Sequence, residues 1–265
     1  MGEKFPFALP PSVGREEAAA RAARLQTHLR AALGVDAVVS VASDYRALKQ
    51  DLISGALHAA WGPPFICARV ETYGGRGLVR GVRNGSSSYR AALVARRDRQ
   101  IVLGKTTGLR LAWVDPDSVS GCLLPRAILD ERGSAGFRFI ADERFAGSFR
   151  AALGEVLAGK ADLTGVWAPA EGAPDPLPAL VELAGERAPE LAVLALSKPC
   201  PNDGVVVSPF APKDVVRELE RVLLELPGTE GGRDILKTVF GAQRFERAPA
   251  GSYKALNELV FGSAA

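Results

Sequence analysis

Apolar and polar positions alternate along the first quarter of the chain with two different periods. Residues 15–33 repeat small apolar side chains at helical spacing, and Gly34 can end this helix. The apolar runs at 36–42 and 57–61 have the length of buried strands, and residues 44–54 between them repeat again at helical spacing. Strand, helix and strand in this order are typical of a parallel sheet with helical crossovers.

The same alternation restarts after a predicted strand at 89–96. Further strands are expected at 109–114, 136–140, 161–167, 191–196 and 204–208, and helices at 120–131, 145–158, 212–226, 230–240 and 251–261. This pattern predicts two α/β lobes, each a mostly parallel sheet flanked by helices. Lobe I is expected to hold residues 1–95 and 200–265, and lobe II residues 96–199, with hinge crossings near 89–96 and 191–202. Pro6 interrupts the first strand, which favours an edge or extended segment there.

The composition argues against a nucleic-acid partner and against insertion into a membrane. The 265 residues include 33 Lys and Arg against 30 Asp and Glu, interspersed along the chain, so we expect no nucleic-acid partner. No run approaches the roughly 18 apolar residues of a membrane span, so no membrane insertion is expected. The start, Met1 to Pro6, has neither the basic nor the apolar region of a signal peptide. The protein is therefore predicted to be periplasmic or extracytoplasmic if a leader was removed, and cytoplasmic if this start is native.

Cysteine and histidine usage indicates neither a disulfide framework nor a metal site. Cys67, Cys122 and Cys200 are an odd, sparse set without a CxxC motif, and each is expected to be a small buried residue. His28 and His58 are not at metal-ligand spacing. We expect no metal and no cofactor.

The stretch 113–125 carries the most chemical information. A predicted strand ends there, a turn follows, and Pro125 fits the first turn of the next helix. The free N–H groups of that helix start would lie near the hydroxyls of Ser118 and Ser120, which favours an anion site. An ordinary serine-capped helix is the alternative.

Tyr45 and Tyr89 are the two tyrosines at expected junctions between loops and regular elements. A phenol at such a junction can donate a hydrogen bond to an anion. Each could instead be a half-buried packing aromatic.

Sequence motifs of common enzyme classes are missing: there is no GxSxG, P-loop, GxGxxG or HExxH. Cys122 stands near a helix start, which could lower its pKa, but no base is recognisable beside it. Asp115, Asp117 and Asp203 are the other candidates for a catalytic group. We therefore predict that the protein is not an enzyme.

Six short stretches follow one another in a fixed order over nearly the whole chain: Ser43–Leu48, Gly55–Pro63, Ser88–Tyr89, Asp115–Gly121, Phe145–Ser148 and Pro201–Val207. Together they resemble the phosphonate-binding family of ABC-transporter solute-binding proteins. The resemblance implies a two-lobed periplasmic-binding-protein fold of type II, with the ligand in the cleft between the lobes.

The resemblance also implies ligand-binding residues. Those assigned to the anionic end of the ligand are Tyr45, Tyr89, Ser118, Val119 and Ser120. Asp203 would face an amine of the ligand, where the ligand has one.

Two of the differences from the family's pattern bear on the expected ligand. Phe149 stands where His is usual, and the stretch around Trp167 lacks a second acidic residue that helps to bind an amine. If both rings face the ligand, they favour apolar surface, so we expect a larger, less charged ligand or an anion without an amine. Alternatively, both rings pack into the core of lobe II.

The expected function is capture of a small anionic ligand, a phosphonate, a phosphate-like anion or a related metabolite. The partner would be an ABC permease for transport, or a sensor protein. A cytoplasmic enzyme on the same fold, acting on a small carboxylate or phosphorylated metabolite, is the alternative.

Overall fold

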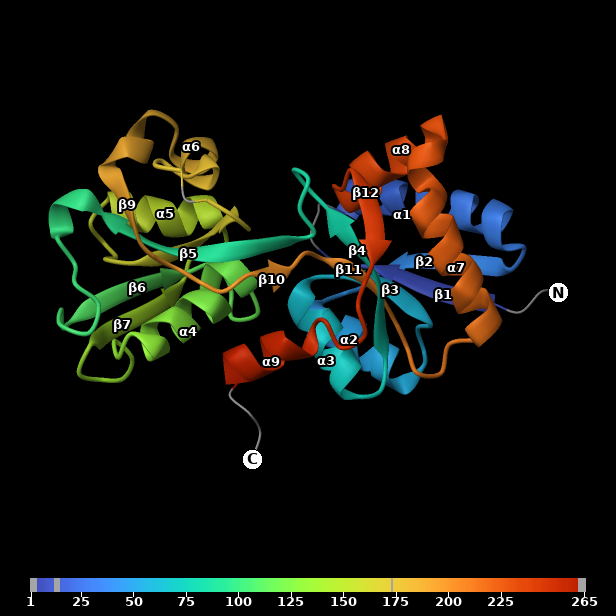
Figure 1. Cartoon of the computed structure of the whole chain (residues 1–265), viewed down its shortest axis with the longest axis horizontal. Coiled ribbons are helices and arrows are strands. Elements are labelled where there is room, and N and C mark those ends of the chain that lie inside the picture. Colours follow the sequence, from blue (N-terminus) through green and yellow to red (C-terminus); the bar gives the residue numbers. More distant parts are fainter. Residues whose placement is uncertain (1–3, 12–14, 173, 262–265) are drawn as a thin grey trace. The chain divides into compact units, whose positions relative to one another are not determined.

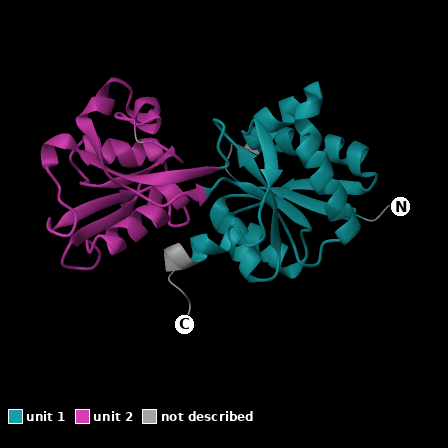
Figure 2. Ribbon diagram, in the orientation of Figure 1, with its two compact units in different colours: residues 1–87, 201–258 teal, residues 88–200, 259–265 magenta. Residues whose placement is uncertain are grey.

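The computed structural model describes residues 4–11, 15–172 and 174–261, which form two compact units (Figure 2). Unit 1 comprises Met1–Ser87 and Pro201–Glu258, and Ser88–Cys200 belong to unit 2. The chain therefore crosses first between Ser87 and Ser88, before the predicted range of 89–96. Extending lobe I to residue 95 placed a whole strand in the wrong unit, because β5 (Ser88–Arg96) is paired within the sheet of unit 2.

Unit 1 is built on a six-stranded sheet in the order β12-β4-β11-β3-β1-β2. Its strands are β1 (Lys4–Leu9), β2 (Asp36–Val41), β3 (Ala59–Gly62), β4 (Arg76–Val82), β11 (Gly204–Val207) and β12 (Arg244–Arg247). β1 pairs in parallel with β2 and β3, whereas β11 is antiparallel to both β3 and β4. The sheet is therefore mixed: β1 to β4 run in one direction, and β11 and β12 run against it.

Helices cover this sheet in two groups. They are α1 (Arg15–Leu33), α2 (Tyr45–Ser54), α3 (Pro64–Thr72), α7 (Lys213–Glu225) and α8 (Glu230–Ile235), followed by α9 (Lys254–Phe261). α1 contacts α7, and α2 contacts α3 (Figure 1). Alternate residues of β1, Phe5, Phe7 and Leu9, join the core under α1 and α7. Because β1 lies between β2 and β3, the edge position predicted from Pro6 is wrong; pairing with β3 begins only at Phe7, after the missing N–H.

Unit 2 has its own sheets and core. The strands are β5, β6 (Leu109–Trp113), β7 (Ile140–Phe145), β8 (Thr164–Pro169), β9 (Leu191–Leu196) and β10 (Cys200–Pro201), and the helices are α4 (Leu124–Glu131), α5 (Phe149–Leu157) and α6 (Pro178–Ala184). β5 pairs antiparallel with β8 and β9, while β6 and β7 form a parallel pair. The sheets of unit 2 are mixed as well. The α/β class itself is confirmed.

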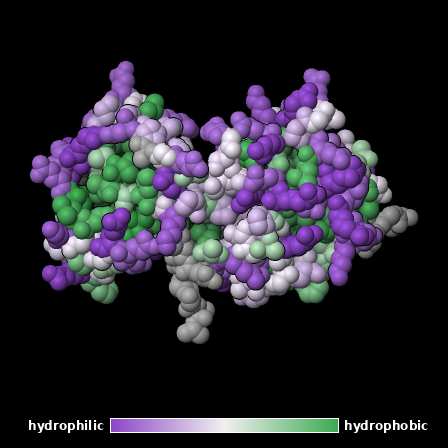
Figure 3. All heavy atoms as spheres, in the orientation of Figure 1, coloured by the Kyte–Doolittle hydropathy of each residue, from purple (hydrophilic) through white to green (hydrophobic). Residues whose placement is uncertain are grey.

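Within the described ranges, no helix is both long and apolar enough to cross a membrane. Hydrophilic side chains cover much of both units on the face shown in Figure 3. The described residues also contain no group of three His, Cys, Asp or Glu side chains arranged to hold a metal ion.

Candidate functional site

The helix start at Ser118 follows β6 in unit 2. The Asp115 carboxylate accepts a hydrogen bond from the Asp117 N–H at 2.9 Å, which closes the turn after the strand. Ser118 then caps a π-helical turn, Val119–Leu123, that runs on into α4, and its Oγ accepts from the Gly121 N–H at 3.2 Å. A Cβ at Gly121 would lie 2.7 Å from that oxygen, so only glycine allows the chain to pass so closely.

This arrangement leaves donors available at the start of the helix. The N–H groups of the first turn, which includes Val119 and Ser120, have no acceptor inside the helix. Ser118 uses its hydroxyl oxygen as the cap, so the hydroxyl proton remains able to donate. Ser120 is 7% exposed, and its hydroxyl makes no hydrogen bond within the described part of the chain. The serine cap is present, and it is compatible with the predicted anion site.

The two predicted tyrosines lie in different units. Tyr45 is the first residue of α2 in unit 1, directly after Asp44, whose carboxylate accepts from the Ala47 N–H at 2.7 Å. Tyr89 lies in β5 of unit 2, opposite Pro169. Both rings are half-buried. Their role as donors to the ligand stays a prediction.

Phe149 and Trp167 contact each other in unit 2. Their ring centroids are 5.0 Å apart at an angle of 86°, an edge-to-face pair. Both rings pack against the core formed by residues such as Val166 and Leu180. The contacts favour the packing alternative for this pair, while each ring stays half-buried. A role in specificity stays a prediction.

Asp162 is a buried acid of unit 2 that is paired with two arginines. Its side chain is 4% exposed and accepts hydrogen bonds from the guanidinium groups of Arg99 and Arg110, each at 2.9 Å. Burial favours the neutral acid, but the hydrogen bonds and charge of Arg110 keep the pKa of Asp162 below its usual value. The carboxylate therefore has a structural role in unit 2.

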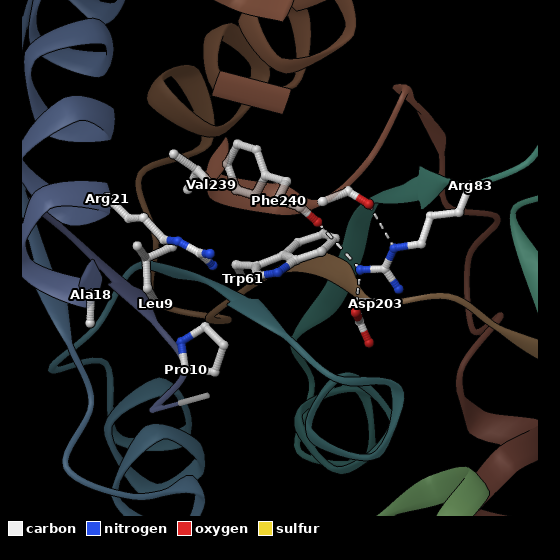
Figure 4. Close-up of a pocket in the computed structure, with 10 residues that line it drawn as sticks. Leu9, Pro10, Ala18, Arg21, Trp61, Arg83, Asp203, Val239 and Phe240 are labelled. Atoms are coloured by element: carbon white, nitrogen blue, oxygen red, sulfur yellow. Dashed lines mark hydrogen bonds and ion pairs between the residues drawn. The ribbon is translucent and has the colours of Figure 1, made fainter. Parts of the chain in front are cut away.

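A pocket of about 210 Å³ opens in unit 1. It is lined from six separate parts of the chain by Leu9, Pro10, Ala18, Arg21, Trp61, Arg83, Asp203, Val239, Phe240 and Gly241. Trp61 is 6% exposed and packs edge-on against Phe240, with centroids 5.2 Å apart. Arg21 and Arg83 reach the pocket from opposite sides of this indole (Figure 4).

Asp203, the residue predicted to face an amine of the ligand, lines this pocket and is already paired. Its contact with a ligand stays a prediction. Its Oδ2 lies 2.6 Å from Nη2 of Arg83. Arg83 also donates from Nε to the Gly241 carbonyl at 2.9 Å and from Nη2 to the Phe240 carbonyl at 3.3 Å (Figure 4). Sequence reasoning missed Arg83 altogether.

A local signal for Arg83 was nevertheless present. Asn84 and Gly85 both have positive φ, 50° and 78°, and the N–H groups of Arg83 and Ser86 bond each other's carbonyls at 2.9 and 3.0 Å. Asn-Gly is the usual pair for such a two-residue turn. The dipeptide Asn84-Gly85 therefore predicts a tight hairpin next to Arg83. It does not predict that the Arg83 side chain enters the pocket.

The thiol considered as a nucleophile is unsuited to that role. Cys122 is fully buried, and burial raises its pKa to about 11, so the thiolate is scarce at neutral pH. Cys67 is also buried, and burial raises the pKa of its thiol well above the usual value. Burial of all three cysteines agrees with their predicted packing role.

Comparison with known proteins gives one family and several related folds. A family model described as "ABC transporter, phosphonate, periplasmic substrate-binding protein" matches residues 7–253. No curated protein sequence matches the chain.

Three solved proteins illustrate the structural similarity. XAC2383 from Xanthomonas citri, solved with chloride and with ATP, is 20% identical with TM-scores of 0.80 and 0.77, covering 98% of this chain and 96% of that one. PhnD1 from Prochlorococcus marinus with methylphosphonate has a TM-score of 0.70 and 17% identity, covering 97% and 96%. PA3383 of Pseudomonas aeruginosa, a binding protein of an ABC phosphonate transporter, has a TM-score of 0.67 and 17% identity, covering 98% and 86%. These similarities confirm the type II periplasmic-binding-protein fold.

Proposed function

Because the chain belongs to the phosphonate-binding family of periplasmic substrate-binding proteins of ABC transporters, we propose that it captures a small phosphonate or phosphate-like anion and delivers it unchanged to a membrane permease. The helix start at Ser118 is the observation that carries this proposal. It offers free backbone N–H groups, two serine hydroxyls and the positive end of a helix dipole to one anion.

The ligands of the related structures support an anionic ligand. Methylphosphonate, chloride and ATP, the species bound to PhnD1 and XAC2383, are all anions at neutral pH. In this chain we propose that Ser118 and Ser120 donate through their hydroxyls and Val119 through its N–H. Tyr45 and Tyr89 are proposed as further donors.

The experiment is a calorimetric titration with methylphosphonate and inorganic phosphate. Ser118→Ala and Ser120→Ala should each weaken binding by about 1.5–3 kcal/mol, the usual cost of losing a hydrogen bond to a charged group. Thr229→Ala is the matched control, because Thr229 caps α8 in unit 1 in the same way, through its hydroxyl and the Gly232 N–H at 3.0 Å.

Two results would overturn the proposal. One is that none of these anions binds the wild-type protein. The other is that the control weakens binding as much as the two serine variants. Phosphorus NMR of the recovered ligand completes the test, since a converted product would contradict simple capture.

A further inference from the structure

More cationic than anionic side chains line the pocket in unit 1. Arg21, Arg83 and Asp203 are the charged residues that line it, two guanidinium groups and one carboxylate. Arg21 is paired with Glu17 on the same helix, outside the lining, while Asp203 is paired with Arg83 inside it. A carboxylate that would otherwise attract a cation therefore has its charge balanced within the pocket.

Groups other than Asp203 also hold Arg83 in place. Its backbone belongs to the two-residue turn at Asn84 and Gly85, and its guanidinium bonds the carbonyls of Phe240 and Gly241. The turn is braced by Asn202, which is 3% exposed and donates to the Gly81 and Ser86 carbonyls, each at 2.9 Å. The guanidinium is thus fixed in place before any ligand arrives.

The Arg83 guanidinium can still donate further hydrogen bonds. Nε and Nη2 are occupied by the two carbonyls and Asp203, whereas Nη1 has no partner within the described ranges (Figure 4). A guanidinium presents its N–H groups in a plane that suits a carboxylate or phosphonate. An ammonium placed at Asp203 would instead approach a fixed like charge a few ångströms away.

We propose that Arg83 is a specificity-determining residue that makes the unit 1 pocket select an acidic group of the ligand and reject an amino group. This inference rests on the proposed capture of organophosphonates and names their class: phosphonates that carry a second acid, such as a carboxylate. Leu9, Pro10 and Val239 offer apolar surface for the carbon atoms next to this acid.

The test compares two ligands of equal length. 3-Phosphonopropionate and 2-aminoethylphosphonate share a two-carbon spacer and differ in the terminal carboxylate or ammonium. The wild-type protein should bind 3-phosphonopropionate at least tenfold more tightly by calorimetry. Arg83→Met leaves the Asp203 carboxylate without its ion pair, so this variant should bind 2-aminoethylphosphonate more tightly than 3-phosphonopropionate.

Arg80→Met is the matched control. Arg80 lies in β4, three residues before Arg83, and pairs through Nε with Glu246 at 2.8 Å, but it does not line the pocket. Losing this ion pair should leave 3-phosphonopropionate the more tightly bound of the two ligands. A reversal in Arg80→Met as well would overturn the inference, since the effect would not belong to the pocket.

Methylphosphonate separates this inference from the proposed function. If the wild-type protein binds methylphosphonate but prefers 2-aminoethylphosphonate to 3-phosphonopropionate, the inference is wrong and the proposed function stands. If none of the three ligands binds, the proposed function itself fails. Should Arg83→Met not fold, Arg83→Gln removes the charge but keeps a polar side chain, and it should lower the affinity for 3-phosphonopropionate at least tenfold; an unchanged affinity would overturn the inference.

Discussion

The helix start at Ser118 and the pocket around Arg83 prepare for a ligand in different ways. The first is made by a few consecutive residues of unit 2, whose backbone N–H groups and hydroxyls offer donors. The second collects side chains from six parts of unit 1, and an ion pair between two of them balances part of its charge. A local site can accept a generic anion, whereas an assembled pocket can discriminate between ligands that share that anion.

The largest loss of stability around the unit 1 pocket is expected from a substitution at Gly204, next to Asp203. An added Cβ would lie 2.6 Å from the Val79 carbonyl oxygen and closer still to the Tyr253 hydroxyl. Gly204→Ala should therefore lower the free energy of unfolding by about 3 kcal/mol, at the upper end for overpacking. Chemical denaturation measures it.

Gly154→Ala is the control, because a Cβ at Gly154 in α5 would meet no described atom within 4 Å apart from neighbouring backbone of its own helix. It should be neutral or slightly stabilising, since alanine is the better helix former. Equal losses in both variants would contradict the packing argument at Gly204.

Asn202→Ala should have the next largest effect. It removes a buried hydrogen bond to the Gly81 carbonyl and a partly buried one to the Ser86 carbonyl, and leaving such groups unsatisfied costs about 1–3 kcal/mol. Because this amide braces the Arg83 turn, the variant should also reduce the preference for 3-phosphonopropionate. A stable variant with unchanged preference would show that the turn needs no brace.

Acid should weaken unit 2 through Asp162. A carboxyl whose pKa is lowered by folding stabilises the native state above its unfolded value, about 3.9, and loses that contribution as pH falls through the folded value. Asp162→Asn should therefore flatten the dependence of stability on pH below about 4. Denaturation curves at pH 3 and pH 6 test it; an unchanged slope would count against the role of Arg110.

The smallest effect is expected at the cap of α8. Thr229→Ala removes one helix cap and should cost about 1 kcal/mol of stability without changing any ligand affinity. A thermal melt and one titration suffice. If Thr229→Ala also weakened ligand binding, the loss of any helix cap would lower the affinity. The effects of Ser118→Ala and Ser120→Ala could then not be assigned to lost contacts with the anion.

Local features were predictable from the sequence, and assembled ones were not. The turn, serine cap and helix start at 118–131 follow from neighbouring residues and were predicted with nearly correct bounds. β4 was missed because Gly77 and Gly81 interrupt its pattern, although both make room for rings, those of Tyr253 and Trp61.

The start of α3 was missed for a similar reason. Pro63 and Pro64 suggested only the end of a strand, whereas Pro64 opens the helix as its first residue. The ion pair between Arg83 and Asp203 joins residues 120 positions apart, and no periodicity could have related them. The α/β class was thus accessible from patterning, while the charge of the unit 1 pocket required the folded chain.

The measurement that tests the central claim most directly is a nitrogen–proton NMR titration of the wild-type protein with methylphosphonate. The account predicts that the backbone amides of Val119 and Ser120 show some of the largest shifts, because they donate to the bound anion. Saturable binding that leaves both amide signals unmoved would contradict it.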